Sequence, residues 1–304
     1  MKKFICLTGI FLLVSLSVIL TMVTVTIVIM SQASFRIDSN KNILILGTSL
    51  TAACIDDNIF IRSANLSEKG TAHMYSYCKL KKILENNQQI DTVLLSFSYL
   101  ELTKEREDLW IMNEKFLVPR VSYSITLLGK EEFLVYNNKR VLLQAILKVP
   151  IRNAGSVVKY FLKGGKNFSY KDLRIGGYYK MNGSFVQRAI EKREQEFVLH
   201  PLVIEESPII KEYLFKIVDC CKRHNVKLIL LSPPIYKSER YGDMDKMYEY
   251  HSKYLNEIEL LDYSNFIFPD ESYYLDIMHL NHKGAEIFSN YLQENLVNDL
   301  KMQP

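Results

Sequence analysis

The chain has 304 residues, of which 48% are hydrophobic, 24% are charged and 12% are aromatic, and its formal net charge is +4. This composition is typical of a globular protein with a large buried core. It excludes a largely disordered chain, because aromatic residues are abundant while glycine and proline are sparse.

A charge-free apolar segment lies at the N-terminus. Phe4 to Met30 contains no charged side chain over 27 residues, which is enough for a helix that crosses a bilayer with some tilt. Lys2 and Lys3 precede it, and the positive-inside rule keeps such lysines in the cytoplasm. We therefore expect residues 1–33 to be an anchor and linker in the cell membrane, with an extracytoplasmic C-terminal domain that is periplasmic or extracellular.

A cleaved signal peptide is the alternative for this segment, because Ser31-Gln32-Ala33 resembles a small-residue cleavage site. Signal peptides have apolar cores of about 7–15 residues, so the length favours an anchor. An exported domain is not expected to bind nucleic acid, and no nucleic-acid recognition motif is present.

From residue 34 onward, short apolar runs alternate with amphipathic segments. The runs that predict strands are 42–47, 61–66, 91–97, 226–232 and 258–263. The segments that predict helices are 71–86, 207–224, 243–256 and 282–296. This alternation is typical of a parallel sheet with helices on both faces. We expect one three-layer α/β/α, flavodoxin-like domain over residues 34–304, with about five parallel strands.

Residues 109–199 interrupt this alternation and are too many for a connecting loop, so we expect a mostly helical insertion. Between Glu114 and Glu196 there are 16 Lys and Arg against 7 Asp and Glu, which gives a local charge of 16 − 7 = +9. The insertion could be a lid or docking surface for anionic headgroups or an acidic polymer. It could equally have an ordinary solvated basic face.

The segment Gly47-Thr48-Ser49-Leu50-Thr51 follows the first predicted strand. A serine on a strand-to-helix turn lies above the sheet, where its hydroxyl can be exposed near backbone N–H groups. The same position also suits a simple helix cap. The GxSxG elbow of the common α/β-hydrolases is absent.

Asp276 and His279 stand three residues apart before the last predicted helix. At this spacing a carboxylate can bond the imidazole and fix its tautomer, which leaves the other ring nitrogen free to take a proton from a serine. A metal site with His282 is the alternative, but His282 fits better as the start of the helix. We expect no metal and no cofactor. Isolated histidines such as His73 are expected at the surface or at helix ends.

Together these segments resemble the SGNH (GDSL-like) hydrolases and acyltransferases, and look closest to a membrane-anchored branch that modifies envelope polysaccharides. The resemblance implies that Ser49 is the nucleophile, His279 the base and Asp276 the residue that orients it. Asn65-Leu66-Ser67-Glu68-Lys69-Gly70 is similar to the family's second block, which implies that Gly70 gives a backbone N–H to the oxyanion and that Asn65 is a further oxyanion or substrate-binding residue. Leu280, Asn281 and Gly284 are in register with the last block.

One block of the family is missing. The family usually has a Gly-x-Asn segment after the third strand, whose asparagine helps to bind the oxyanion, and this chain has Ser96-Phe97-Ser98-Tyr99 there. Ser98 or Tyr99 could donate instead. Loss of one such donor typically costs about 10²–10³ in rate.

Two functions follow from the resemblance. The first is a serine-dependent esterase or O-acyltransferase that acts on acyl, above all acetyl, esters of an extracytoplasmic envelope glycan. A transferase would need a membrane protein that delivers the acyl group. The second is a catalytically inactive SGNH-fold binding or scaffold protein of the cell envelope, which the missing asparagine favours.

Overall fold

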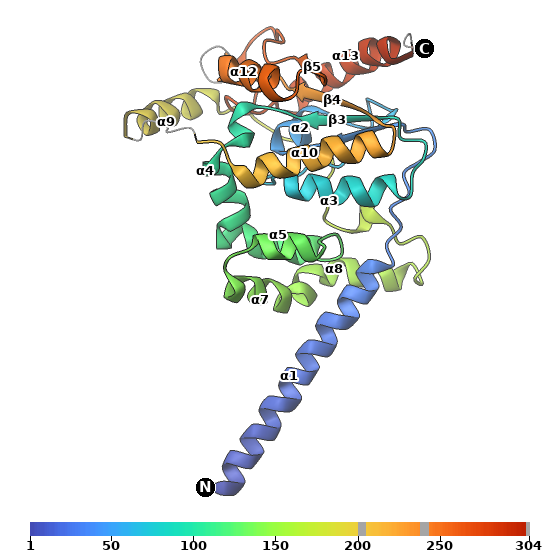
Figure 1. The fold of residues 1–304 in the computed structure, drawn as a ribbon, viewed down its shortest axis with the longest axis vertical. Coiled ribbons are helices and arrows are strands. Elements are labelled where there is room, and N and C mark those ends of the chain that lie inside the picture. The colour runs from blue at the N-terminus through green and yellow to red at the C-terminus, as the bar shows by residue number, and fades with distance from the viewer. Residues whose placement is uncertain (200–204, 238–242, 302–304) are drawn as a thin grey trace. The chain divides into compact units, whose positions relative to one another are not determined.

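The computed structural model describes residues 1–199, 205–237 and 243–301 (Figure 1). The chain divides into two compact units. The first combines Met1–Arg36 with Met112–Ile175, and the second combines Ile37–Ile111 with Gly176–Pro304. The apolar N-terminal helix and the first part of the basic insertion therefore belong to one unit.

The second unit is built on a five-stranded sheet. Its strands are β1 (Ile43–Leu46), β2 (Ser63–Asn65), β3 (Thr92–Ser96), β4 (Lys227–Ser232) and β5 (Glu259–Asp262). They are all parallel, in the order β2-β1-β3-β4-β5. This is the flavodoxin-like order 2-1-3-4-5, so the predicted α/β fold class is confirmed. In such sheets the site lies at the carboxyl ends of the strands, where the chain order reverses between β1 and β3.

The central strands are apolar along most of their length because helices cover both faces of the sheet. All four residues of β1 are fully buried. On one face, alternate strand residues such as Ile45 and Ile229 pack into a core cluster with Cys54 of α2 and Phe288 of α13. Helices α3 and α10 pack against each other on the other face (Figure 1).

The helices of the second unit have the following bounds: α2 (Ser49–Cys54), α3 (His73–Leu84), α4 (Lys104–Glu107), α9 (Val186–Leu199), α10 (Pro208–Arg223), α12 (Met244–Tyr254) and α13 (His282–Lys301). Two 3-10 helices, η1 (Tyr99–Leu102) and η4 (Glu271–Tyr273), also belong to it. A π-helical turn, η2 (Asp108–Met112), lies where the chain leaves this unit.

The first unit is helical. Its elements are α1 (Lys2–Ser31), α5 (Glu114–Ser124), α6 (Lys130–Val135), α7 (Lys139–Leu147), α8 (Val149–Leu162) and the 3-10 turn η3 (Tyr170–Asp172). The last turns of α1 pack against α8 and α7, and α5 packs against both α7 and α8. By length and composition, α1 and the helical stretch Lys139–Leu162 are long and apolar enough to cross a membrane.

Candidate active site

The loop between β1 and α2 places Ser49 at the carboxyl edge of the sheet. Gly47 has a φ of +150°, and a Cβ atom there would lie 2.2 Å from Cβ of Ser96 at the end of β3. Only glycine therefore lets this loop pass so close to β3. Thr48 caps α2 by accepting a hydrogen bond from the Leu50 N–H (3.3 Å), and Ser49 is the first helical residue, half-buried.

The loop before α13 brings Asp276 and His279 to the same place. The Asp276 carboxylate accepts hydrogen bonds from the backbone N–H groups of Met278 (2.8 Å) and His279 (2.9 Å). Nδ1 of His279 lies 2.9 Å from Oδ1 and 3.0 Å from Oδ2 of Asp276. Nε2 of His279 lies 2.9 Å from Oγ of Ser49, 230 positions earlier in the chain. The structure thus joins all three predicted residues in one hydrogen-bonded chain.

The surroundings of Asp276 favour its ionised form beside the His279 ring. Burial raises the pKa of Asp276, but the hydrogen bonds from the His279 ring and from the backbone N–H groups outweigh burial, so the net pKa lies below the ordinary value. The side chain is therefore an anion at neutral pH. An anion beside Nδ1 favours a proton on that nitrogen, which leaves Nε2 as the acceptor that faces Ser49.

The remaining residues of the last motif hold this loop in place. The Asn281 side chain donates to the carbonyls of Gly183 (2.9 Å) and Ser272 (2.6 Å) and accepts from the N–H of Lys283 (3.0 Å). His282 turns its ring to the Met181 carbonyl (3.1 Å). Among the described residues, no group of three or more His, Cys, Asp and Glu could hold a metal ion.

The loop after β2 runs beside the loop that carries Ser49. The Glu68 N–H donates to the Gly47 carbonyl (3.0 Å), and the Thr51 hydroxyl donates to the Ser67 hydroxyl (2.9 Å). A buried ion pair between Lys79 and Glu68 (3.3 Å) supports this loop from α3. Gly70, two residues further, has a φ of +56°, in the left-handed region that glycine adopts without strain.

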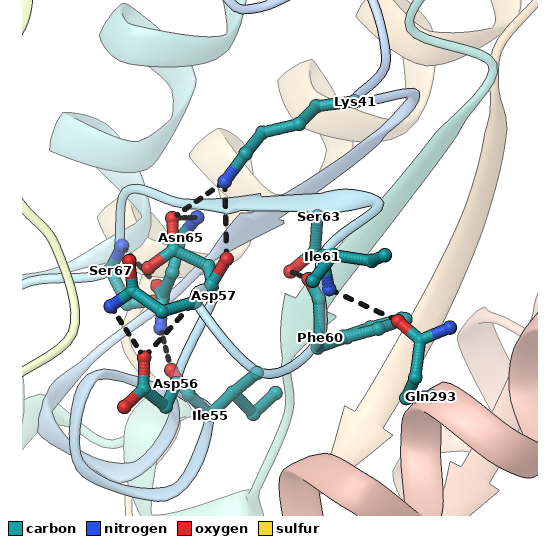
Figure 2. A network of polar contacts seen from close by, with 11 residues as sticks. Lys41, Ile55, Asp56, Asp57, Phe60, Ile61, Ser63, Asn65, Ser67 and Gln293 are labelled. Carbon is teal, nitrogen blue, oxygen red and sulfur yellow. Dashed lines mark hydrogen bonds and ion pairs between the residues drawn. The ribbon is translucent and has the colours of Figure 1, made fainter.

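Asn65 has a structural role rather than the oxyanion role predicted for it (Figure 2). Its side-chain amide donates to the carbonyls of Thr51 (3.1 Å) and Ile55 (2.8 Å), and its side-chain oxygen accepts from the Ser67 N–H (2.9 Å). Both amide protons are therefore used, and the side chain ties the end of α2 to β2. The backbone N–H of Asn65 donates to Asp57 (3.2 Å), which also pairs with Lys41.

The segment after β3 has Ser96, Ser98 and Tyr99 where the family has its asparagine. Ser96 donates its hydroxyl to the Glu101 carboxyl (3.0 Å to each oxygen), and the side chain of Ser98 is buried. The Tyr99 ring lies beside α12, with Nζ of Lys246 5.7 Å from the ring centre. Ser98 lies near the Glu101 carboxyl, and its role as an alternative oxyanion donor stays a prediction.

Two buried ionisable residues near Ser49 were not predicted to belong to the site. Burial raises the pKa of Glu101, although the nearby hydroxyls of Thr48, Ser96 and Ser98 lower it in part. Burial lowers the pKa of His73 to about 4, and His73 also bonds the backbone of Ser96. His73 is the first residue of α3, so it lies at a helix end as expected, but it is buried there and not exposed. A glutamate inside an otherwise apolar and hydroxyl-rich run was the only available signal for Glu101.

A cavity of about 290 Å³ lies beyond the carboxyl ends of β4 and β5. It borders the loop that carries Asp276 and His279, because the Tyr236 N–H donates to the Ile277 carbonyl (3.1 Å). Its walls include Tyr236 and Tyr274, whose rings meet edge to face at 5.4 Å. The Glu271 carboxylate lies within 3.4 Å of the Tyr236 hydroxyl.

The chain has few similarities to known proteins. A protein-family model matches residues 205–301, which is less than half of the chain. No curated protein matches the sequence. A crystal structure from Bacteroides fragilis, provisionally described as an acylhydrolase, is 11% identical, with 86% of this chain and 90% of that chain covered and a TM-score of 0.38. None of these similarities assigns a function to the chain.

Proposed function

We propose that the protein is a serine-dependent esterase or O-acyltransferase of the SGNH type, acting on acyl, above all acetyl, esters of an extracytoplasmic envelope glycan. The observation that supports this most strongly is the hydrogen-bonded series of Ser49, His279 and Asp276. His279 lies 2.9 Å from Ser49 and 2.9 Å from Asp276, and the first of these contacts joins distant parts of the sequence. A serine, a base and an orienting carboxylate in this order are the parts needed for acyl transfer.

In the proposed reaction Oγ of Ser49 attacks the acyl carbon while Nε2 of His279 takes the hydroxyl proton. The carbon–oxygen bond to the alcohol then breaks, and His279 returns the proton to the departing alcohol oxygen. The acyl group is left on Ser49 as an ester. Water or a sugar hydroxyl, deprotonated by His279, attacks this ester and frees Ser49, while Asp276 stabilises the imidazolium in both halves.

The negative charge on the tetrahedral intermediate needs donors beside Ser49. We assign this role to the backbone N–H groups of Ser49 and Gly70. The loop with Gly70 runs along the loop with Ser49, held there by the bond from Glu68 to the Gly47 carbonyl (3.0 Å). Backbone donors in fixed positions stabilise such a charge without having to reorganise during the reaction.

A glycan fits the cavity next to the catalytic loop. The half-buried Tyr236 offers aromatic surface against which the apolar face of a sugar ring can pack, with the buried Tyr274 ring behind it, and Glu271 can accept bonds from sugar hydroxyls. Tyr236→Ala should therefore raise KM for an acetylated oligosaccharide. It should leave hydrolysis of p-nitrophenyl acetate, which has no sugar, close to wild type.

In this proposal α1 anchors the protein in the cell membrane. As an uncleaved span it would place the second unit outside the cytoplasm, where envelope glycans are found. If the enzyme is a transferase, its acyl donor has to be supplied across the membrane by a partner protein.

Labelling of the full-length protein in detergent by a serine-directed fluorophosphonate tests the proposal. We expect labelling of the wild type and none of Ser49→Ala or His279→Ala, with circular dichroism to establish that all three are folded. A folded wild type that is not labelled would contradict the enzyme. Incubation of an acyl donor ester with either water alone or a soluble oligosaccharide then separates an esterase from a transferase.

An inactive scaffold is the second candidate. It is favoured by the region after β3, where the Ser96 hydroxyl is bound to Glu101 (3.0 Å) and the Ser98 side chain is buried. Without the side-chain donor, the rate of an enzyme would be lower by about 10²–10³. A folded but unreactive Ser49 would support this second function.

A further inference from the structure

The surface formed by α7 and α8 of the first unit leaves large apolar side chains exposed. Lys139–Leu162 forms one helical stretch, in which Lys148 keeps a right-handed helical conformation between α7 and α8. Its exposed apolar residues follow one another at helical spacing: Leu143, Leu147, Ile151, Val158 and Leu162, with Phe161 at the side. Ile151 is 78% exposed and Leu162 is 82% exposed. We call this set the apolar stripe.

The opposite side of the same helical stretch is packed. Val141, Ala145 and Val149 are buried, and the Asn153 amide donates to the Ser122 carbonyl of α5 (2.9 Å). Ser156 donates to the Asp172 carbonyl (2.8 Å). The apolar stripe is therefore not the core side of these helices, which is already occupied by α5 and η3.

Basic residues line one edge of the apolar stripe. Lys148, Arg152, Lys159 and Lys163 recur at the helical spacing i, i+4, i+11 and i+15, and each lies one position after a stripe residue. Lys148 and Lys159 are exposed, whereas Lys163 pairs with Asp172 (2.6 Å) and Arg152 is half-buried against the Tyr123 ring. Over residues 130–166 there are eight Lys and Arg and two Glu, a local charge of 8 − 2 = +6. An apolar stripe with a basic edge is the pattern of helices that lie in a membrane interface and contact anionic lipid.

Helix α1 gives this surface a position relative to a bilayer. Residues 4–22 of α1 have no buried side chain, and Val23 is the first buried residue. Nineteen residues rise about 28 Å in a helix, close to the roughly 30 Å thickness of the hydrocarbon core. Beyond Val23, α1 packs against α8 and α7, at the depth where it would leave the hydrocarbon.

We infer that α7 and α8 lie on the membrane, with the apolar stripe in the headgroup boundary of an anionic lipid bilayer and the basic edge at its phosphates. This inference rests on α1 crossing the membrane, and it is independent of the catalytic proposal. The same helical stretch does not span the bilayer, because Lys148 and Arg152 lie in its middle and α5 covers its other side.

Tryptophan quenching by brominated phosphatidylglycerol tests the inference on the full-length protein in vesicles. The wild type has one tryptophan, the buried Trp110, whose signal is subtracted. We expect Ile151→Trp and Val158→Trp to be quenched, as Leu12→Trp within α1 should be. Glu114→Trp, an exposed position on α5, is the matched control and should not be quenched.

Three results would overturn the inference. Ile151→Trp could stay unquenched while Leu12→Trp is quenched, which would place α8 in water. Leu12→Trp could itself be unquenched, which would remove the anchor on which the inference rests. Ile151→Trp could be unquenched but shift to shorter emission wavelength as the protein density in the vesicles rises, which would assign the stripe to a second copy of the chain. Fluorophosphonate labelling of Ser49 in the same vesicles reports separately on the catalytic proposal.

The basic edge has its own test. Lys148→Gln and Lys159→Gln should each lower the ratio of docked to undocked molecules by about fivefold on phosphatidylglycerol vesicles. Lys115→Gln on α5 should have no effect. Equal quenching of Ile151→Trp in phosphatidylcholine vesicles, unchanged by either substitution, would overturn the assignment of an anionic surface.

Discussion

Asp276 and Glu101 are two carboxyl groups beside the loop that carries Ser49, and their surroundings are opposite. Asp276 is partly exposed and receives hydrogen bonds from the His279 ring and two backbone N–H groups, which favour its charged form. Glu101 is buried, and burial favours its neutral form. One is therefore suited to support a transient positive charge, whereas the other holds the end of β3 through Ser96.

This difference shows how one fold assigns two roles to the same functional group. A carboxylate that works on an imidazole has to stay ionised, and hydrogen bonds to its oxygens secure this. A carboxyl that fills the core beneath the site costs least when it carries a proton. The comparison predicts that substitutions at Asp276 affect reactivity, whereas substitutions at Glu101 affect stability.

The largest effect is expected for Asp276→Asn. The rate of fluorophosphonate labelling at Ser49 should fall by about 10⁴-fold, because an amide favours the wrong tautomer of His279. The melting temperature should change little. Asp245→Asn, an exposed carboxylate on α12, is the control and should label at the wild-type rate. A labelling rate within tenfold of wild type, about 1.4 kcal/mol, would show that Asp276 does not orient His279.

Glu101→Ala should mainly destabilise the protein, by about 3 kcal/mol, because it opens a cavity and leaves the Ser96 hydroxyl without its partner. Chemical denaturation in detergent measures this loss. Glu105→Ala, at an exposed position on α4, should be close to neutral. If Glu101→Ala kept full stability but lost labelling, Glu101 would act on reactivity as Asp276 does. That result would contradict the structural role assigned to Glu101.

The buried His73 should make the stability of the protein depend on pH. Its pKa is lowered to about 4 by burial, so below the ordinary value of 6.5 the unfolded chain binds a proton that the folded chain does not. Stability should therefore fall as the pH drops from 6.5 towards 4, by at most about 1.4 kcal/mol per pH unit. The free energy of unfolding of His73→Asn should show a flatter pH profile. Parallel profiles for the two proteins would contradict a buried neutral His73.

The smallest effect concerns the protonation of Glu101. Its pKa is raised by burial, so the stability that its neutral form contributes is complete below the unfolded value of 4.5 and is lost as the pH rises through the folded pKa. Glu101→Gln keeps the neutral shape at every pH. Wild type should therefore lose stability relative to Glu101→Gln as the pH rises above the unfolded value of 4.5. A relative gain for wild type over this range would mean that Glu101 is held as an anion.

The two units differ in how far local sequence determines them. The buried strands could be predicted because a parallel strand covered on both faces needs an unbroken apolar run, as in Ile43–Leu46. The insertion could be predicted to be helical and basic, but its division between the two units could not be predicted. Residues 112–175 belong with α1, whereas residues from Gly176 onward belong with the sheet. The pair Gly176-Gly177 predicts a turn at that point, but it does not indicate a change of unit.

The order of strands and helices, the apolar N-terminal segment and the spacing of Asp276 and His279 could be predicted from the sequence, since each depends on residues close together in the chain. Contacts between distant segments could not be predicted: His279 meets Ser49 across 230 positions, Glu101 and His73 are buried beside Ser96, and the Asn65 amide donates to Thr51 and Ile55. The exposed side of α8 could not be predicted either. These features depend on which surfaces the fold brings together. The periodicity of a sequence predicts which face of a helix is apolar, but it does not predict which element packs against that face.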